Sequence, residues 1–465
     1  MPSLPLALPS YQLRSRASPA RVIGWMPAMV ESGQGKQVGY LKQVPGLVQK
    51  VNTTKVIRCM FASQGGLYVV AGDTFYSVAS DWTATAKGTL LTSTGNVEAA
   101  DNETQICFVD GLYGYVYDID ADTFTQISDT DFLGSYDVDV LDGYGVFSDP
   151  GTNTFYVSGL QDFTTYSALE QVSIEGITGN IVGHVARGHE VYIFKERSGE
   201  VWYNAPQTNF PLTRNDSAAI EVGCSAAGSL RKIGGMIYWL GQDSNGQAMV
   251  FAMSAYSPQR ISNTALEEKL NAITDLSTAT AYAYQQEGLT FYVLRHPSLT
   301  TTWVYEVSSG VWHERAEWVD GLPAPWRATH HAFAFGLHIV GDADGKLYEL
   351  SVTANDNAGD TLIRDIITPE TPNASLSRQR YSSIEVNCDV GQGKTDGTEA
   401  YLLCRYSDDS GKTWSSWKYL SLGVVGNYAK RVRATRLGSS RHRVWNFRVT
   451  DPVNVSLIEA VFNEV

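Results

Sequence analysis

The chain has 465 residues, of which 43% are hydrophobic, 11% aromatic and only 18% charged. This length is unusual for a single compact core, and the net charge of −14 argues against a general nucleic-acid-binding protein, which carries a basic footprint. The 25 Tyr, 11 Trp and 42 Gly residues are typical of a β-rich protein with many turns. No run in the sequence approaches the roughly 20 apolar residues that a membrane-spanning helix requires.

Residues 1–50 are predicted to form an extended N-terminal arm. Its proline density excludes a long helix, with prolines at positions 2, 5, 9, 19, 27 and 45. The apolar start, Met1–Pro9, is short and its arginines follow it, which is the reverse of a secretion signal. We expect segments such as Arg21–Trp25 to add a strand to a sheet formed by later parts of the chain.

Between residues 51 and 353 a glycine repeatedly leads into an apolar and aromatic run. These glycines are Gly66, Gly111, Gly143, Gly188, Gly235, Gly288 and Gly336. Subtracting their positions gives steps of 45, 32, 45, 47, 53 and 48 residues. A period near 45 with strand-like units is typical of a β-propeller, whose small sheets pack radially against one another. The pattern therefore predicts a propeller of about seven blades, with six and eight left open.

A second pattern in four of these units pairs a tyrosine with a large aromatic residue seven positions later. The pairs are Tyr117/Phe124, Tyr156/Phe163, Tyr203/Phe210 and Tyr305/Trp312. Turn-forming residues separate the members, so each pair predicts two strands joined by a tight turn. One segment departs from the strand pattern, because apolar residues spaced three or four apart predict a short helix within Asn263–Leu276.

The last part of the chain is predicted to form a separate domain. Residues 354–379 are polar and are expected to be a linker, whereas residues 380–465 alternate polar and apolar side chains, as in Arg443–Val449. The expected fold is therefore all-β: an arm at 1–50, a β-propeller at 51–353, a linker at 354–379 and a β-sandwich-like domain at 380–465.

One motif in this C-terminal domain matches the Asp-box pattern S-x-D-x-G-x-T-W. Its positions are Ser407, Asp409, Gly411, Thr413 and Trp414. A carboxylate that accepts bonds from turn amides and a glycine that permits a positive φ suit a folded hairpin turn. Such turns usually lie away from catalytic centres, so we predict a structural role.

The segment 427–450 has no acidic residue but seven basic ones, so the rest of the chain carries −14 − 7 = −21. Lys430, Arg431, Arg433 and Arg436 form a candidate interface with an acidic partner or a neighbouring subunit. Arg441, Arg443 and Arg448 complete the cluster. The alternative is a solvated strand face, since strand surfaces commonly carry arginine.

Other motifs give no catalytic, cofactor or metal site. The carboxylates of Asp118, Asp120 and Asp122 resemble the start of a calcium loop, but Thr123 replaces the glycine and Asp129 the final glutamate. His330 and His331, with His338 nearby, lack ligands at metal spacing. The five cysteines form no CxxC motif and are predicted to be buried, reduced thiols. No P-loop, GxSxG or helix-leading GxGxxG is present.

The chain resembles the packaged-DNA stabilisation proteins of short-tailed bacteriophages, which form the tail hub, or nozzle. The resemblance covers nearly the whole length. It rests on short strings in order, among them Ser198–Trp202, Phe210-Pro211, Glu221–Cys224, Trp239–Gly241, Arg260–Ser262, Thr302–Tyr305, Trp312–Arg315, Arg405–Trp414, Arg431–Arg433 and Thr450–Pro452.

The resemblance implies a structural virion protein with no catalytic residues. Such hubs are assembled in the host bacterial cytoplasm as a homohexameric ring below the portal and its head-to-tail adaptor. They close the DNA exit channel after packaging, and they hold tailspikes or tail fibres and a needle or plug. DNA passes through the lumen of the ring without sequence-specific binding.

Two alternatives belong to other functional classes. A glycan-active, sialidase-like propeller enzyme would need an arginine cluster, a Tyr/Glu nucleophile pair and usually several Asp-boxes inside the repeats, whereas this chain has one, outside them. A cellular scaffold propeller fits poorly with the long arm and the added C-terminal domain.

Overall fold

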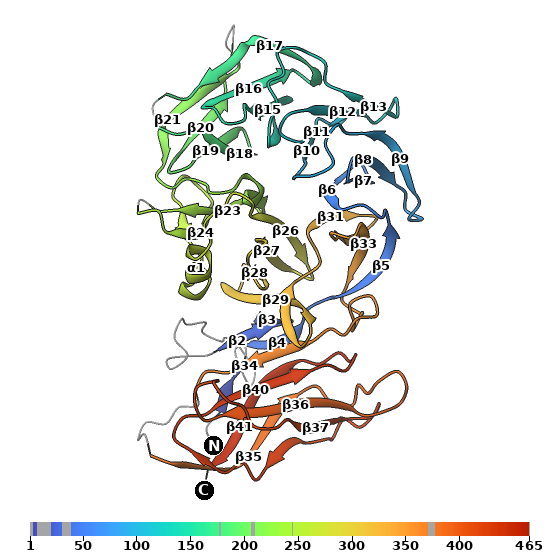
Figure 1. Ribbon diagram of the computed structural model, residues 1–465, viewed down its shortest axis with the longest axis vertical. Helices are drawn as coiled ribbons and strands as arrows, with labels where there is room; N and C mark the ends of the chain where they lie inside the picture. Colours follow the sequence, from blue (N-terminus) through green and yellow to red (C-terminus); the bar gives the residue numbers. More distant parts are fainter. Residues whose placement is uncertain are drawn as a thin grey trace.

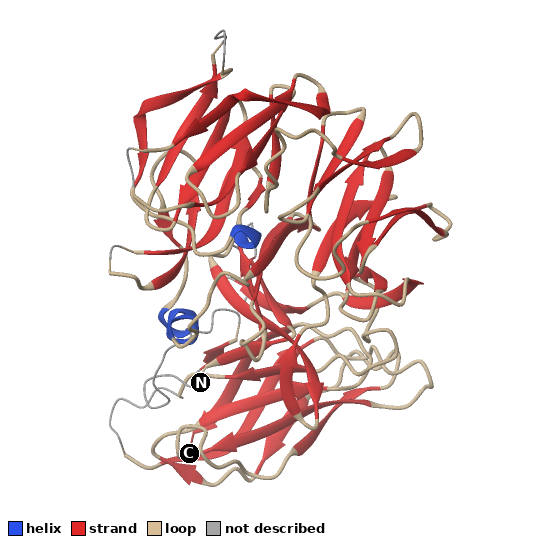
Figure 2. Cartoon of the chain, turned by 45° about the horizontal axis from the view of Figure 1, so that its top comes forward, coloured by secondary structure: helices blue, strands red, loops and turns tan. Residues whose placement is uncertain are grey.

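The structure is a computed structural model that describes residues 3–6, 20–29, 39–175, 178–205, 210–243, 245–370 and 377–464. It has two parts, a propeller built from radial sheets and a β-sandwich beside its rim (Figure 1). Strands dominate both parts, as Figure 2 shows. Among the described residues, no helix has the length and apolar character needed to cross a membrane. The predicted all-β fold, with a propeller and a C-terminal β domain, is confirmed.

Within the described residues the propeller has seven four-stranded antiparallel blades. The first strand of each blade contacts the first strands of its two neighbours, so these strands surround the central axis. In chain order, the first three blades are β6 (Ile57–Ser63), β7 (Gly66–Ala71), β8 (Thr74–Val78) and β9 (Ala84–Thr89); β10 (Glu98–Asp101), β11 (Gln105–Val109), β12 (Gly114–Asp118) and β13 (Thr123–Gln126); and β14 (Val138–Leu141), β15 (Tyr144–Ser148), β16 (Thr154–Gly159) and β17 (Asp162–Ser173). The next three are β18 (Ile181–Arg187), β19 (Glu190–Lys195), β20 (Gly199–Asn204) and β21 (Leu212–Ile220); β22 (Arg231–Ile233), β23 (Met236–Gln242), β24 (Ala248–Met253) and β25 (Gln259–Arg260); and β26 (Thr280–Gln286), β27 (Leu289–Arg295), β28 (Thr302–Glu306) and β29 (Val311–Val319). The seventh blade combines β31 (His330–Ala334), β32 (Leu337–Gly341) and β33 (Lys346–Ser351) with β5 (Gly46–Asn52).

The circle is closed by a strand from the beginning of the chain. β5 runs antiparallel to β33, with Gly46 opposite Ser351 and Asn52 opposite Lys346. The last blade is therefore made from residues about 300 positions apart. The boundary expected at residue 50, between arm and propeller, lies inside β5.

The glycine pattern follows the turns of the blades, with one exception. Six of the seven glycines lie at the turn between the first and second strands, whereas Gly111 lies between the second and third strands of its blade. The first turn of that blade is formed instead by Asn102 and Glu103, without a glycine. This difference accounts for the short step of 32 residues.

The aromatic pairs are only partly cross-strand neighbours. Tyr117 lies opposite Phe124, and Tyr305 lies opposite Trp312, as predicted. In the other two blades the aromatic residues are not opposite each other, because Tyr156 faces Gln171 and Tyr203 faces Thr213. The predicted tight turn is present between β16 and β17, where Gly159 lies opposite Asp162, but not between β20 and β21, since β20 ends at Asn204 and β21 begins at Leu212. A register shift between Tyr156 and Ser158 alters the pairing in the first of these two blades.

Helical structure is limited to two short elements within the described residues. The predicted helix is confirmed as α1 (Thr264–Asn271), where the side chain of Asn263 accepts a hydrogen bond from the Leu266 amide at 2.9 Å and caps the N-terminus. Leu266 and Leu270 are buried in the core between two blades. A single 3₁₀ turn, η1 (Ala227–Ser229), leads into β22.

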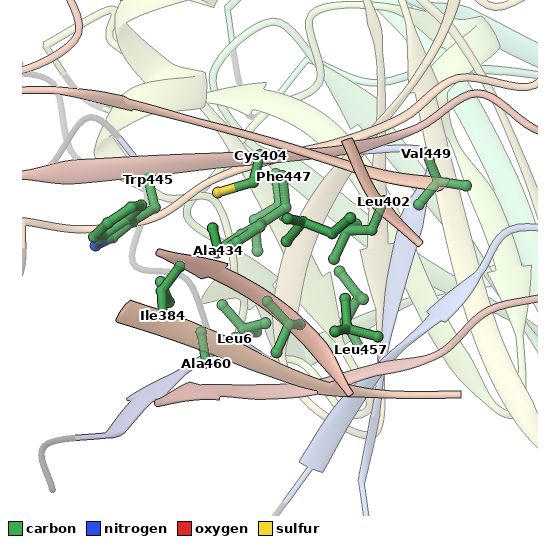
Figure 3. Close-up of a cluster of buried hydrophobic side chains, with 14 of the residues drawn as sticks. Leu6, Ile384, Leu402, Cys404, Ala434, Trp445, Phe447, Val449, Leu457 and Ala460 are labelled. Carbon is green, nitrogen blue, oxygen red and sulfur yellow. The ribbon is translucent and has the colours of Figure 1, made fainter. Parts of the chain in front are cut away.

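The C-terminal domain is a sandwich of two sheets. One contains β1 (Ser3–Pro5), β3 (Trp25–Met29), β4 (Gly39–Gln43), β35 (Gln379–Cys388), β38 (Val432–Thr435), β39 (Ser439–Ser440) and β41 (Leu457–Glu464). The other contains β2 (Arg21–Ile23), β34 (Arg364–Ile367), β36 (Ala400–Ser407), β37 (Lys418–Gly423) and β40 (Val444–Val449). Side chains such as Leu6, Ile384, Leu402, Phe447 and Leu457 fill the space between them (Figure 3).

The N-terminal arm is thus a structural part of the sandwich as well as of the propeller. β2 pairs with β34 on one side and, in parallel, with β29 of the propeller on the other, so one sheet continues through both parts. The chain crosses to the opposite sheet at Gly24, whose φ is +71° and where a Cβ would lie 2.6 Å from the Ile363 carbonyl oxygen. β30 (Leu322–Pro325) extends β29 as a hairpin. The range predicted as a linker, 354–379, includes β34.

Candidate functional site

The central channel of the propeller is crossed by ion pairs. It encloses a cavity of about 490 Å³ lined by the innermost strands. Arg231 of β22 reaches Glu98 of β10, on the far side of the channel, at 2.8 Å. Lys232 reaches Asp139 of β14 at 3.1 Å. Duplex DNA, whose major groove alone is about 12 Å wide, cannot pass between side chains that meet at these distances.

Titratable side chains in the channel contact other residues of the same chain. Burial raises the pKa of Asp137 to about 6, although the neighbouring His184 favours the charged form. Burial also lowers the pKa of both His330 and His331 to about 3, so these histidines are neutral at pH 7. His331 stacks on Tyr284 and its Nε2 lies 3.0 Å from Nδ1 of His338. No cluster of potential metal ligands is found among the described residues.

The Asp-box forms the connection between β36 and β37. Asp409 Oδ1 accepts hydrogen bonds from the amides of Lys412 at 2.9 Å and Thr413 at 2.8 Å, and from the Ser407 hydroxyl at 2.6 Å. The Ser407 and Thr413 bonds hold the pKa of Asp409 below its usual value. Gly411 has a φ of +90°. The side-chain oxygens of Ser407, Asp409 and Thr413 are therefore used to fold the hairpin.

Trp414 leads into an alternating stack of rings and guanidinium groups. From one end, the order is Trp318, Arg448, Trp417, Arg405 and Trp414, with guanidinium-to-ring-centre distances of 4.5, 5.2, 4.2 and 4.6 Å. Trp318 belongs to β29 and the other four to the sandwich, so the stack connects the two parts of the molecule. The two tryptophans three positions apart are a sequence signal for this stack, but the contribution of Trp318 has none.

The basic segment divides into an outward and an inward group. Arg431 pairs with Glu385 at 2.5 Å, Lys430 with Glu399 at 3.6 Å, and Arg433 donates to the Ser383 hydroxyl at 2.9 Å. Arg436 is exposed. Arg443, by contrast, is buried against Asp408 at 2.7 Å, and Arg448 pairs with Asp365 at 2.7 Å. The structure thus leaves the four candidate interface residues on the outside of the sandwich.

The carboxylates that resemble a calcium loop form a turn between β12 and β13. Asp118 accepts a bond from the Ala121 amide at 2.8 Å, and Asp122 accepts one from the Tyr117 hydroxyl at 2.7 Å. Asp122 also pairs with Lys87 of the preceding blade at 2.7 Å. Their arrangement joins strands and blades rather than surrounding a common point.

Comparison with solved structures gives matches of low similarity. The extracellular domain of the hybrid two-component system BT4673 from B. thetaiotaomicron is 12% identical, with a TM-score of 0.45, over 85% of this chain and 57% of that one. The WD40 propeller of Doa1 is 11% identical, with a TM-score of 0.42, over 66% and 96%. The designed protein Ika8 is 11% identical, with a TM-score of 0.41, over 66% and 99%.

Family comparison is specific. No curated protein matches the sequence. A family model described as "Bacteriophage P22 Gp10, beta-propeller" matches residues 25–355, and a second, "Bacteriophage P22 Gp10, beta-sandwich", matches residues 367–463. The two matches follow the two parts of the structure and together span most of the chain. The chain therefore belongs to the bacteriophage P22 Gp10 family of phage stabilisation proteins.

Proposed function

We propose that this protein is the tail hub, or nozzle, of a short-tailed phage. Family membership makes it a structural tail protein and a component of the virion. In the proposed role six copies form a ring below the portal and its head-to-tail adaptor. The ring closes the DNA exit channel, stabilises the packaged genome, and anchors tailspikes or fibres and a needle or plug. It performs no catalysis.

The closed channel of the propeller is the observation that supports assembly into a ring. Because Arg231 and Glu98 meet across it, DNA has no route through a single subunit. A protein of this family that surrounds exiting DNA must therefore form the passage between subunits. Closed rings require a contact between two different surfaces of the same chain. The exposed basic residues of the sandwich, in a chain with excess acid elsewhere, supply one such surface.

The charge of the chain supports a passage that DNA can slide through. Six copies at −14 each carry −84 formal charges. An acidic wall repels phosphates, so DNA within it would move rather than adhere. The proposal requires acidic side chains on the lumen wall. A lumen lined mainly by Arg and Lys would contradict this part of it.

Assembly with the portal–adaptor complex tests the proposal directly. The purified chain is mixed with that complex, and the product is sized by analytical ultracentrifugation and imaged by electron microscopy. We expect a sixfold ring attached below the adaptor, and virions that lack the protein should lose their packaged DNA. A chain absent from virions, or one that hydrolyses a sialoside as a free monomer, would contradict the proposal.

A further inference from the structure

One face of the propeller carries a group of exposed apolar side chains. Because strands alternate in direction, the turns between second and third strands and the connections between blades lie on the same face. Val56, Leu91, Leu112, Leu133 and Tyr136 are all in such turns or connections, and all are exposed, Tyr136 by 60% and Leu112 by 70%. The first three blades therefore present an apolar rim. Exposed apolar groups that gather in this way mark interaction sites.

A cavity of about 720 Å³ opens at the centre of this face. We call it the mouth cavity; Val56 and Tyr136 line it at the rim, and Ala226, Ala227 and Ala279 line it deeper. The small side chains leave the space open. Its volume lies in the range of pockets that take up apolar groups of a ligand or a partner.

Arg58, the arginine that the described residues place in the mouth cavity, has no donor left for a ligand. Arg58 is 3% exposed, and its five N–H groups are bound within the chain: Nε by Gly95, Nη1 by Gly72 and Thr92, and Nη2 by Thr92 and Thr94, at 2.6–2.9 Å. A guanidinium offers five donors in all. The mouth cavity therefore does not suit a phosphate, and a polypeptide is the fitting occupant.

The surroundings of the mouth cavity are acidic. In the turns and connections of this face carboxylates outnumber cations, and they include Asp110, Asp129, Asp131, Asp149, Glu175 and Glu196. Lys55, one of the few cations there, pairs with Asp73 at 2.6 Å. A partner that combines apolar side chains with positive charge matches this face.

The sandwich presents that combination. The loop after β37, residues 424–430, exposes Val424, Val425 and Tyr428, and we call it the tip loop. It is ordered by bonds from the Gly426 amide to the Gly391 carbonyl at 3.0 Å and from the Asn427 amide to Val424 at 3.1 Å. A preorganised loop loses little conformational entropy on docking.

Positive charge follows the tip loop directly. Arg433 in β38 and Arg436 beyond it are exposed, and within the described part of the chain neither forms an ion pair with a carboxylate. Lys430 and Arg431 add charge that Glu399 and Glu385 partly neutralise. The acid-poor segment of the sandwich is thus adjacent to its exposed apolar side chains.

We propose that the tip loop of one copy docks in the mouth cavity of the next copy, with Arg433 and Arg436 facing the acidic connections. The contact joins two different surfaces, so repetition produces a ring or a helical filament rather than a closed dimer. The position of this contact in the virion rests on the proposed hub function. The contact between subunits itself does not depend on that position.

Disulfide trapping in the full-length chain tests the contact. Val425→Cys is combined with Tyr136→Cys at the mouth cavity, and in the matched control with Leu160→Cys, which is 60% exposed in a turn on the opposite face. The natural thiols give little background, because four are buried and burial raises the pKa of the fifth, Cys388, to about 12. Val56→Cys provides a second mouth position if Tyr136→Cys proves unstable in a melting assay.

Oxidation is carried out on the chain alone and on the chain with the portal–adaptor complex. When Val425→Cys is combined with a cysteine at the mouth cavity, we expect a ladder of covalent oligomers that extends beyond the dimer. When it is combined with Leu160→Cys, the yield of covalent oligomers should be at least tenfold lower. Equal trapping at Leu160, dimers from Val425→Cys alone, or no oligomers in either preparation would overturn the contact. Rings seen by microscopy without trapping would overturn this contact and leave the hub function intact. Trapped oligomers of a protein that is absent from virions would support this contact and overturn the hub function.

Discussion

Arg21, in the N-terminal arm, binds Glu314, in β29 of the propeller, through two hydrogen bonds of 2.9 and 2.7 Å across 293 positions of sequence. Glu314 is only 1% exposed. Burial alone would raise its pKa, but the bonds and charge of Arg21, with help from Lys269 and Thr301, hold the pKa of Glu314 below its ordinary value. The pair lies where β2 joins the sandwich to the propeller.

Replacing Arg21 by Met should destabilise this junction by about 3 kcal/mol, because it leaves a buried carboxylate without its main partner. The loss is measured by urea unfolding at pH 7. Since the folded pKa of Glu314 is lowered, its contribution is complete above about pH 4.3 and disappears as pH falls through the folded value. The variant should therefore differ least from the parent at the most acid pH. A constant difference down to pH 3 would contradict this account.

The stack of rings and arginines should depend on guanidinium geometry at Arg448. Arg448→Ala removes two ring contacts and the ion-pair partner of Asp365, with an expected cost of about 2–3 kcal/mol. Arg448→Lys keeps the charge but cannot stack as a plane, so it should recover only part of the loss. Chemical unfolding followed by tryptophan fluorescence measures both. Arg433→Ala, at an exposed position, serves as the matched control and should change stability by less than about 0.5 kcal/mol.

Removal of the Asp409 carboxylate should loosen the hairpin between β36 and β37. Asp409→Ala leaves the amides of Lys412 and Thr413 without their acceptor and should lower the melting temperature of the protein. Because the pKa of Asp409 is lowered, the difference from the parent should vanish as pH falls below the ordinary range of a carboxyl group. Asp120→Ala, in an exposed turn of the propeller, is the control and should melt like the parent.

Acidification should weaken the propeller through its buried histidines. Burial lowers the pKa of His331 to about 3, whereas the unfolded chain protonates near 6.5, so stability is complete above pH 6.5 and falls as pH decreases toward 3. His331→Gln should reduce the drop in melting temperature between pH 7.5 and 5.5. His189→Gln, at a histidine whose side chain is 89% exposed, should leave the drop unchanged. Identical pH profiles for the parent and His331→Gln would contradict the expectation.

Charge reversal at the start of β38 should block assembly without unfolding the chain. Arg431→Glu together with Arg433→Glu places two carboxylates on the exposed basic face. The change removes the ion pair between Arg431 and Glu385, but this pair lies at the surface and contributes little to stability. The double variant should keep the parental melting temperature and circular dichroism spectrum but fail to form rings on the portal–adaptor complex. Normal assembly would remove these residues from the subunit contact.

Residue patterns predicted the propeller because each blade repeats the same physical problem, a small sheet that needs apolar faces and tight turns. The glycine before the second strand marks six blades. In the remaining blade, β10–β13, Gly111 marks a different turn, because Asn102 and Glu103 form the first turn without glycine. The pattern is therefore a reliable guide to the number of blades but not to every turn within them.

Two strands of the arm, β2 and β5, have no partners near them in sequence. β5 finds β33 about 300 residues later, and β2 lies between strands of two different parts of the molecule. Local alternation says nothing about such pairings. The ion pairs of the two inward arginines, Arg443 and Arg448, could not be predicted from the basic segment either. Their partners Asp408 and Asp365 lie outside that segment.

The position of β5 has a consequence for synthesis. At about 5–20 residues per second, a ribosome needs on the order of 15–60 s after β5 to make the strand against which it closes the circle. β2 and β4 must wait longer still for partner strands, because β34 and β41 lie after residue 360. A polypeptide cut short before β33 has neither a closed circle nor a finished second domain, and one cut short after β33 still lacks the second domain. Incomplete products would thus be excluded from particles by their own failure to fold.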